Sequence, residues 1–216
     1  PVAGLGTRLF PASHAVKKEL FPVVGPDGIA RALLHYHLLD LDAAGIDPDA
    51  RRQIEEELVR ARSLDGAGHP VTLVGTDTHP GNFVMTPPGR AVFVDLEKTL
   101  YGSPAIDLAH ASVYTSTMWD ADVATALAPD DVAAFYAAYF DAVPSELADR
   151  VRPWCEPMRR LTWLRTTTWA AKWRVQSQDG AAWSAMQHDP AFAAAARARI
   201  ADYLDPETIA RIRAGF

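Results

Sequence analysis

From Ser103 onward, the chain carries apolar side chains at the three- and four-residue spacing of amphipathic helices. Start signals such as Ser103 followed by Pro104 divide this pattern into separate segments. The pattern predicts helices at 104–117, 130–142, 154–177, 189–204 and 206–214. This part of the chain is therefore expected to form a helix bundle.

Two further helices are predicted nearer the amino terminus. Apolar residues from Ile29 to Leu41 recur at helical spacing, and Gly45 is a suitable terminator. Pro48 opens a second helix, which has an apolar face and a charged face and ends before the glycines at 66 and 68. The helical pattern thus extends over most of the sequence.

Short β-branched runs lie between these helical stretches. One spans 71–74, and two others, 83–85 and 91–95, flank the turn sequence Thr-Pro-Pro-Gly-Arg at 86–90. The last two runs predict a β-hairpin near the start of the bundle. The expected fold class is therefore α+β and mainly helical.

Composition narrows the possible classes of protein. The 216 residues are 49% hydrophobic and 22% charged, which predicts one or two compact domains. The formal charge of -6 disfavours nucleic acid as a partner, because a phosphate backbone would be repelled overall. No apolar run approaches the roughly 20 residues that span a membrane. We find no export signal, and a lone Cys155 fits a reducing, cytoplasmic location.

The segment from Val74 to Glu97 holds the most informative set of polar residues. Asp77 and Asn82 are five residues apart, and the intervening Pro80-Gly81 turn can fold them onto one side. Asp95 leaves the end of the second strand of the predicted hairpin. Phosphoryl transfer needs a carboxylate beside the attacking hydroxyl and oxygen ligands for magnesium. These three side chains supply both.

The sequences TDTHPGN and VDLEKTLYGSPAIDLA resemble the catalytic loop and metal-binding segment of the aminoglycoside phosphotransferase and choline kinase superfamily. The resemblance implies that Asp77 is the catalytic base. It implies that Asn82 and Asp95 are magnesium ligands, and that Asp107 is a carboxylate bracing the loop. It further implies a protein-kinase-like carboxy-terminal lobe that transfers phosphate from ATP to a hydroxyl of an aminoglycoside, choline or sugar.

This resemblance extends over roughly residues 50–216 and is strongest at 71–112. The sequence departs from the family pattern at Gly75 and Thr76, where the family has His and Gly. That His supports the loop backbone without transferring the proton. Its absence is therefore expected to weaken the loop while leaving the chemistry in place.

Residues 1–46 resemble the opening of a sugar-phosphate nucleotidyltransferase, with the sequence AGLGTR at 3–8 and KKELFPV at 17–23. A glycine loop of this kind binds phosphate through backbone N–H groups, and basic side chains neutralise the charge. The resemblance implies phosphate contacts from the residues Gly4, Gly6, Arg8 and Lys18. We expect a short α/β segment at 1–47 and the kinase-like domain at 48–216.

Several functions remain open at this point. The strand Lys and helix Glu of a kinase's nucleotide-clamping lobe are not evident, so a degenerate, non-catalytic nucleotide-binding or scaffold protein is one alternative. A remnant of a nucleotidyltransferase fusion is another. Trp169 and Trp173, four residues apart, pack in the core or form a wall for a cationic acceptor.

Overall fold

The computed structural model describes residues 22–24, 30–32, 44–64, 68–178 and 190–216. Its helices are α3 (Pro48–Ser63), α4 (Ala105–Ser112), α5 (Tyr114–Thr117), α6 (Pro129–Ala142), α7 (Ser145–Val151), α8 (Cys155–Gln178), α10 (Pro190–Tyr203) and α11 (Pro206–Ala214). The strands are β1 (Pro22–Val24), β2 (Ala30–Ala32), β3 (Thr72–Val74), β4 (Phe83–Thr86), β5 (Arg90–Phe93) and β6 (Leu100–Gly102). Short 3-10 turns are η3 (Pro80–Asn82), η4 (Leu96–Lys98) and η5 (Arg152–Trp154). The expected α+β, mainly helical class is confirmed.

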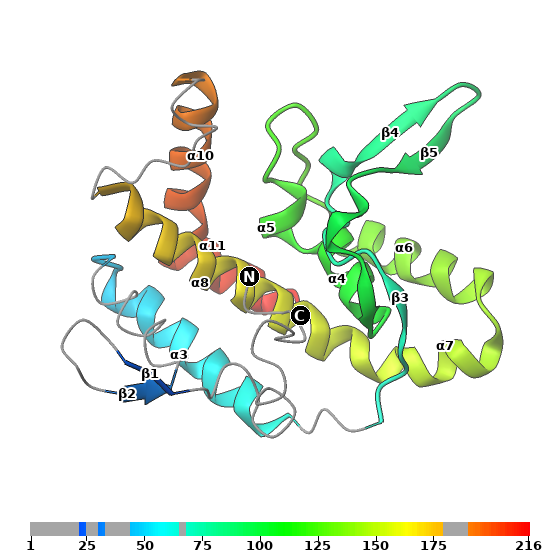
Figure 1. The fold of residues 1–216 in the computed structure, drawn as a ribbon, viewed down its shortest axis with the longest axis horizontal. Helices are drawn as coiled ribbons and strands as arrows, with labels where there is room; N and C mark the ends of the chain where they lie inside the picture. Colours follow the sequence, from blue (N-terminus) through cyan, green and yellow to red (C-terminus); the bar gives the residue numbers. More distant parts are fainter. Residues whose placement is uncertain (1–21, 25–29, 33–43, 65–67, 179–189) are drawn as a thin grey trace.

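The long helix α8 runs through the molecule and is the element on which the others pack (Figure 1). Helices α3, α4, α5 and α10 all contact it, and α11 packs against α3. The core between them contains large side chains with at most 2% exposure, namely Ile54, Trp163, Ile200, Tyr203 and Ile209. Burial of these side chains is the main force holding the bundle together.

A second, smaller core lies on the other side of α4. It contains Ala105 and Leu108 from α4, Val132 and Tyr136 from α6, and Val151 at the end of α7. Because α4 packs in this second core and also contacts α8, its position is fixed from two sides. This matters for the polar residues on its first turn, described below.

The start of α3 shows how local sequence sets a helix boundary. Asp47 accepts hydrogen bonds at Oδ1 from the amides of Asp49 (2.8 Å) and Ala50 (3.4 Å), and Pro48 occupies the first helical position. Side-chain capping satisfies amide groups that lack a partner within the helix. The predicted start at Pro48 is confirmed.

Other helix predictions need correction. The helix predicted at 104–117 is divided at Val113, whose backbone is extended (φ −80°, ψ 138°). Helix α7 was not predicted. The helix predicted from Ile29 to Leu41 is wrong at 30–32, where β2 pairs antiparallel with β1; residues 33–41 lie outside the described ranges. In this segment the backbone groups form hydrogen bonds between two strands, whereas the predicted helix would have formed them within the segment.

Two antiparallel ladders frame the segment of interest. Strand β3 pairs with β6, with Val74 opposite Leu100, and the predicted hairpin β4–β5 is confirmed, with Phe83 opposite Phe93. The rings of these two phenylalanines pack with centroids 5.1 Å apart. Everything from 75 to 99 is therefore one excursion that leaves and returns at the same end of the β3–β6 ladder. Strand β6 was not predicted.

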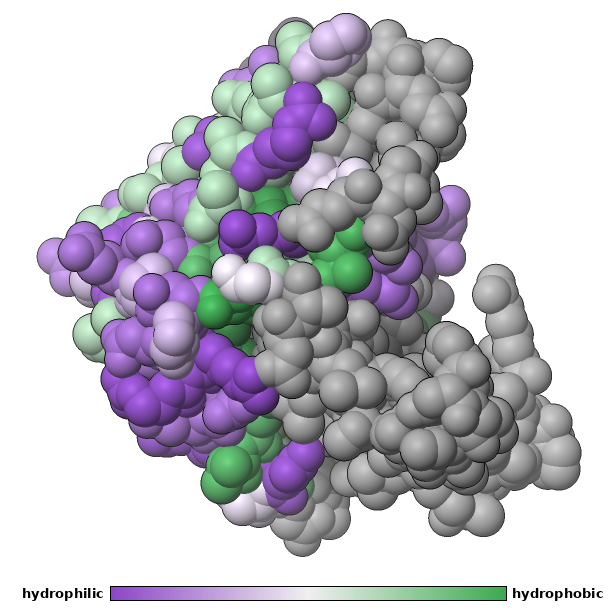
Figure 2. Space-filling view, turned by 90° about the vertical axis from the view of Figure 1, so that its left-hand side faces the viewer, coloured by the Kyte–Doolittle hydropathy of each residue, from purple (hydrophilic) through white to green (hydrophobic). Residues whose placement is uncertain are grey.

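On the side of the molecule where α3 lies, most of the strongly coloured residues in Figure 2 are hydrophilic, with hydrophobic residues among them. The charged face of α3 carries ion pairs at helical spacing, such as Arg51–Glu55 and Arg52–Glu56. Within the described residues, no helix is both long enough and apolar enough to cross a bilayer.

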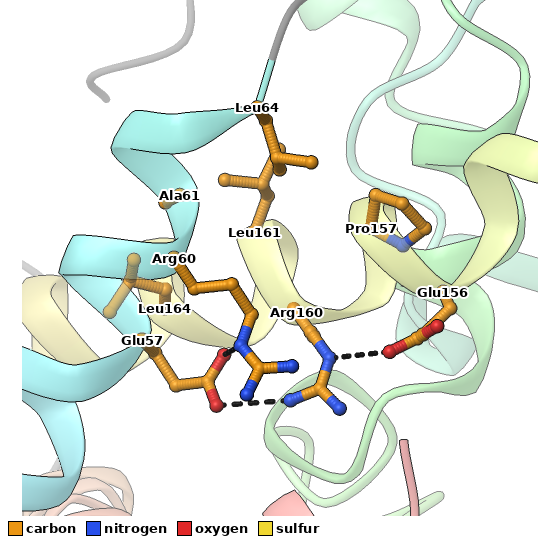
Figure 3. Close-up of a pocket in the computed structure, with 9 residues that line it drawn as sticks. All are labelled: Glu57, Arg60, Ala61, Leu64, Glu156, Pro157, Arg160, Leu161 and Leu164. Carbon is orange, nitrogen blue, oxygen red and sulfur yellow. Dashed lines mark hydrogen bonds and ion pairs between the residues drawn. The ribbon is translucent and has the colours of Figure 1, made fainter.

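A pocket of about 200 Å³ lies between α3 and α8 and is drawn in Figure 3. Apolar and charged side chains line it together, and the carboxylate of Glu57 lies beside Arg60 and Arg160. None of the residues expected to carry chemistry lines this pocket. The residues expected to carry chemistry lie instead on the 75–99 excursion and on α4.

Candidate active site

The loop after β3 brings Asp77 and Asn82 together. The amide nitrogen Nδ2 of Asn82 donates to the backbone oxygen of Asp77 at 2.8 Å. His79 precedes η3 and accepts the Gly81 amide at Nδ1 (3.1 Å), and Pro80 begins that turn. The five-residue spacing in the sequence is thus closed into one compact loop.

Asp107 on the first turn of α4 connects this loop to the helix bundle. Its Oδ2 and Oδ1 atoms accept the backbone amides of Gly75 and Thr76, both at 2.8 Å. The Thr78 hydroxyl donates to the backbone oxygen of Asp107, also at 2.8 Å. Burial raises the pKa of the Asp107 carboxyl above its ordinary value, although the two amide hydrogen bonds act in the opposite direction.

Asp95 follows the end of β5 in the left-handed backbone region (φ 59°, ψ 60°). Its side chain is exposed and caps none of the η4 amides. The Val94 amide donates to the backbone oxygen of Asn82 at 2.9 Å, which extends the β4–β5 pairing by one step. Asn82 and Asp95 therefore lie at the same end of the hairpin.

These two residues fit a magnesium ion by the chemistry of their side chains. With Nδ2 of Asn82 engaged by Asp77, the Oδ1 atom is the one that remains for a metal, and the exposed Asp95 carboxylate caps no amide of η4. Magnesium is bound through few protein oxygens, with water and phosphate completing its shell. Among the described residues, no group of three or more His, Cys, Asp or Glu side chains could hold a metal. A metal site here would therefore have few protein ligands.

The Asp77 carboxylate is held between two groups that sequence reasoning did not single out. The Lys98 ammonium donates to Oδ2, and Nε2 of His110 lies 3.7 Å from Oδ1. Burial raises the pKa of the Asp77 carboxyl, but the hydrogen bond and charge of Lys98 outweigh this effect, so the pKa lies below its ordinary value. Asp77 is therefore ionised at neutral pH.

His110 is 6% exposed, and burial together with the nearby Arg165 lowers its pKa to about 3. The imidazole is thus neutral at pH 7, and its contact with Asp77 is not an ion pair. Arg165 of α8 donates to the backbone oxygen of Thr76 at 3.4 Å. His110 could have been found from the sequence, since it lies one helical turn after Asp107. Arg165 and Lys98 carry no such local signal.

The two positions that depart from the family pattern have distinct structural roles. A Cβ atom on Gly75 would lie 2.5 Å from Cε1 of Phe93, so the hairpin ring occupies the space a side chain would need. Thr76 has a φ of 61°, which is rare for a β-branched residue. The loop is held here by Asp107, Arg165 and the Thr76 side chain, as described below.

The other predicted residues fall into two groups. Gly4, Gly6, Arg8 and Lys18 lie outside the described residues. Trp173 is 8% exposed and packs in the main core, in agreement with the packing interpretation. Trp169 is partly buried and packs against the same core, and its ring meets Trp119 edge to face with centroids 5.2 Å apart.

Comparison with known families decides the class. The sequence model described as the phosphotransferase enzyme family matches residues 14–154, which include the whole 75–99 excursion and Asp107. The chain belongs to this family. The resemblance to aminoglycoside phosphotransferases and choline kinases is thereby supported, whereas the nucleotidyltransferase resemblance of the opening segment receives no support. No curated protein and no solved structure matches the chain significantly.

Proposed function

We propose that this member of the phosphotransferase family transfers the γ-phosphate of magnesium-bound ATP to a hydroxyl group of a small molecule. The observation that carries the proposal is an ionised Asp77 in a loop fixed by Asp107, with Asn82 bonded to the Asp77 backbone and Asp95 at the same end of the adjoining hairpin. A carboxylate and two oxygen ligands on one loop and hairpin are the groups that phosphoryl transfer requires.

In the proposed reaction, Asp77 orients the acceptor hydroxyl and accepts its proton. The acceptor oxygen forms a bond to the γ-phosphorus while the bond from that phosphorus to the bridging oxygen breaks, and ADP leaves with the electron pair. Bound magnesium, held by Asn82 and Asp95, would neutralise charge on the phosphates. Asp107 acts through the backbone of Gly75 and Thr76 and so positions Asp77.

A cationic acceptor is one candidate class. The partly buried pair Trp119 and Trp169 supplies aromatic faces and edges, and aromatic faces attract ammonium groups. Asp120, next to Trp119, places its carboxylate against Gly81 of the catalytic loop. A small alcohol that also carries an amine would find an acidic and an aromatic group beside the reacting centre.

The test is ATP consumption with a panel of amino alcohols, sugars and aminoglycosides. Asp77→Asn keeps the shape of the side chain but removes its basicity, so turnover should fall by about a thousandfold or more. The matched control is Asp149→Asn, which removes a carboxylate from an exposed position in α7. Equal rates for wild type and Asp77→Asn would refute the role of Asp77.

Family membership does not favour a non-catalytic scaffold, but calorimetry with Mg-ATP separates that alternative from an enzyme. A scaffold that binds no nucleotide would give no heat at millimolar ATP, whereas the proposed enzyme binds it.

Nucleotidyl transfer by residues 1–47 is a separate proposal and rests on the sequence resemblance alone. It predicts pyrophosphate release from UTP or dTTP with a sugar phosphate, which Arg8→Gln should abolish.

A further inference from the structure

Thr76 and Lys98 lie opposite each other where the chain leaves and re-enters the β3–β6 ladder. The ladder's last pair is Val74 with Leu100, so these two residues are each two positions beyond it. The Thr76 hydroxyl donates to the backbone oxygen of Lys98 at 3.0 Å. This hydrogen bond fixes the end of η4 against the catalytic loop.

Thr76 makes this bond from an unfavourable backbone conformation. A β-branched residue at a φ of 61° is strained, because its side chain crowds the backbone there. Glycine would adopt the same conformation without that cost, but it has no hydroxyl to donate to Lys98. The strain is therefore held in place by a contact that only a hydroxyl side chain can make.

Lys98 connects this contact to Asp77. Its ammonium group donates to Oδ2 of Asp77, while its side chain remains 54% exposed. Ion pairs with an exposed lysine contribute little to folding stability. The pair is thus better explained by what the ammonium group does in the site than by any need of the fold.

The charged groups around the loop are mostly negative. Asp77 and Asp95 are negative, Asn82 is neutral, and the transferred phosphoryl group brings further negative charge. Arg165 is partly buried and donates to the backbone of Thr76. Among the described residues in contact with Asp77, Lys98 is the cation that solvent and a ligand can reach.

We propose that Thr76 and Lys98 form one unit that presents an ammonium group to the γ-phosphoryl group of the bound nucleotide. The proposal rests on the proposed function. In the free protein Lys98 pairs with Asp77; with nucleotide bound, its ammonium meets the non-bridging oxygens and stays protonated throughout. Thr76 is a positioning residue that acts through the Lys98 backbone. The proton of the acceptor still goes to Asp77, and ADP is still the leaving group.

Calorimetry distinguishes this role from a structural one. In magnesium-containing buffer, Lys98→Gln should weaken binding of β,γ-imido-ATP by about tenfold, the loss expected for one charge-assisted hydrogen bond. ADP lacks the γ-phosphoryl group, so its affinity should change less than about twofold by the same arithmetic. Arg150→Gln, which removes a positive charge from an exposed position in α7, is the control and should change neither affinity.

Rates with the best acceptor of the panel give the second readout. Lys98→Gln should lower kcat by about a hundredfold, as loss of a transition-state charge contact does, and Lys98→Arg should recover part of it. Thr76→Ser keeps the hydroxyl and should resemble wild type. Thr76→Gly should unfold at a higher temperature yet turn over more slowly. In the double variant Thr76→Gly with Lys98→Gln, kcat should fall little further than in Lys98→Gln alone, because both changes disable the same unit.

Several results would overturn the inference. Equal weakening of ADP and of the imido analogue by Lys98→Gln would mean a general structural effect, and unchanged or faster turnover would mean that Lys98 only blocks Asp77. Full activity in Thr76→Gly would remove Thr76 from the unit. If wild type neither binds nucleotide nor transfers phosphate, the proposed function itself fails. An active wild type with an unaffected Lys98→Gln variant refutes this inference alone.

Discussion

Two carboxylates withdrawn from solvent, Glu57 in the helix core and Asp107 beside the catalytic loop, are held in different ways. Glu57 is 2% exposed, and its Oε1 atom accepts from Arg160 (3.0 Å) and Arg213 (3.1 Å), side chains of two other helices (Figure 3 shows the first). Asp107 instead accepts two backbone amides of one loop. The first arrangement joins helices together, and the second fixes the backbone on which the reactive residue stands.

This difference predicts that the two carboxylates contribute differently to stability and to activity. The core around Glu57 is built from large apolar side chains, and neutralising Glu57 takes from Arg160 and Arg213 their buried partner. The loop around Asp107 has little apolar packing of its own and depends on hydrogen bonds. Damage to the core should therefore appear mainly in the free energy of unfolding, and damage to the loop mainly in turnover.

The largest effect on stability is expected for Glu57→Gln. Arg160 keeps its surface partner Glu156, and Arg213 keeps Glu56. The free energy of unfolding should therefore fall by about 3 kcal/mol, at the low end for breaking a buried ion pair. Urea unfolding measures it. The exposed neighbour in Glu56→Gln is the control and should cost much less. Turnover per folded molecule should stay within about twofold of wild type. A large loss of turnover in Glu57→Gln would contradict the expected difference between Glu57 and Asp107.

Asp107→Asn should lower stability by about 2 kcal/mol, because one amide oxygen cannot accept both loop amides and the Asn amino group faces a donor. Turnover should fall by at least about tenfold as Asp77 loses its fixed position. Urea unfolding and the ATP-consumption assay measure the two effects, and Asp149→Asn is again the exposed control. Full activity in Asp107→Asn would show that the loop holds its geometry without the carboxylate.

Gly75→Ala tests the contact between the loop and the hairpin. The added methyl group would meet the Phe93 ring, so the hairpin must shift, at a cost of about 1 to 2 kcal/mol. The double variant Gly75→Ala with Phe93→Leu removes the ring edge and should recover part of that loss in urea unfolding. Without any recovery, the cause of the destabilisation would lie elsewhere than in this contact.

His110 gives the smallest and most specific effect. Its folded pKa of about 3 lies below the unfolded value, so between about pH 6.5 and pH 3 the unfolded chain binds the extra proton. Stability is thus unaffected by His110 above pH 6.5 and falls as pH decreases through this window. His110→Asn should reduce the slope of unfolding free energy against pH by close to one proton between pH 6 and 5. An unchanged slope in His110→Asn would mean that His110 is not buried as a neutral group.

Sequence patterns predicted an element well where local residues mark its ends. The start of α3 at Pro48 is marked by a capping residue, and the hairpin β4–β5 by its turn sequence, and both signals act within a few positions. Helical periodicity alone was less reliable. It failed at Val113, where two packed cores meet and a local signal for the break is lacking. It also missed β6, because a three-residue strand is defined by its partner β3 rather than by its own sequence.

The sequence by itself determined which reactive groups the chain carries and in what order, and this order was enough to indicate the phosphotransferase family. Tertiary structure alone decided that Lys98, 21 residues from Asp77, and Arg165, 89 residues from Thr76, meet in the same loop. Those contacts follow from the register of the β3–β6 ladder and from the packing of α4 on α8. Both are set by burial and pairing across the whole molecule, which no local pattern of residues records.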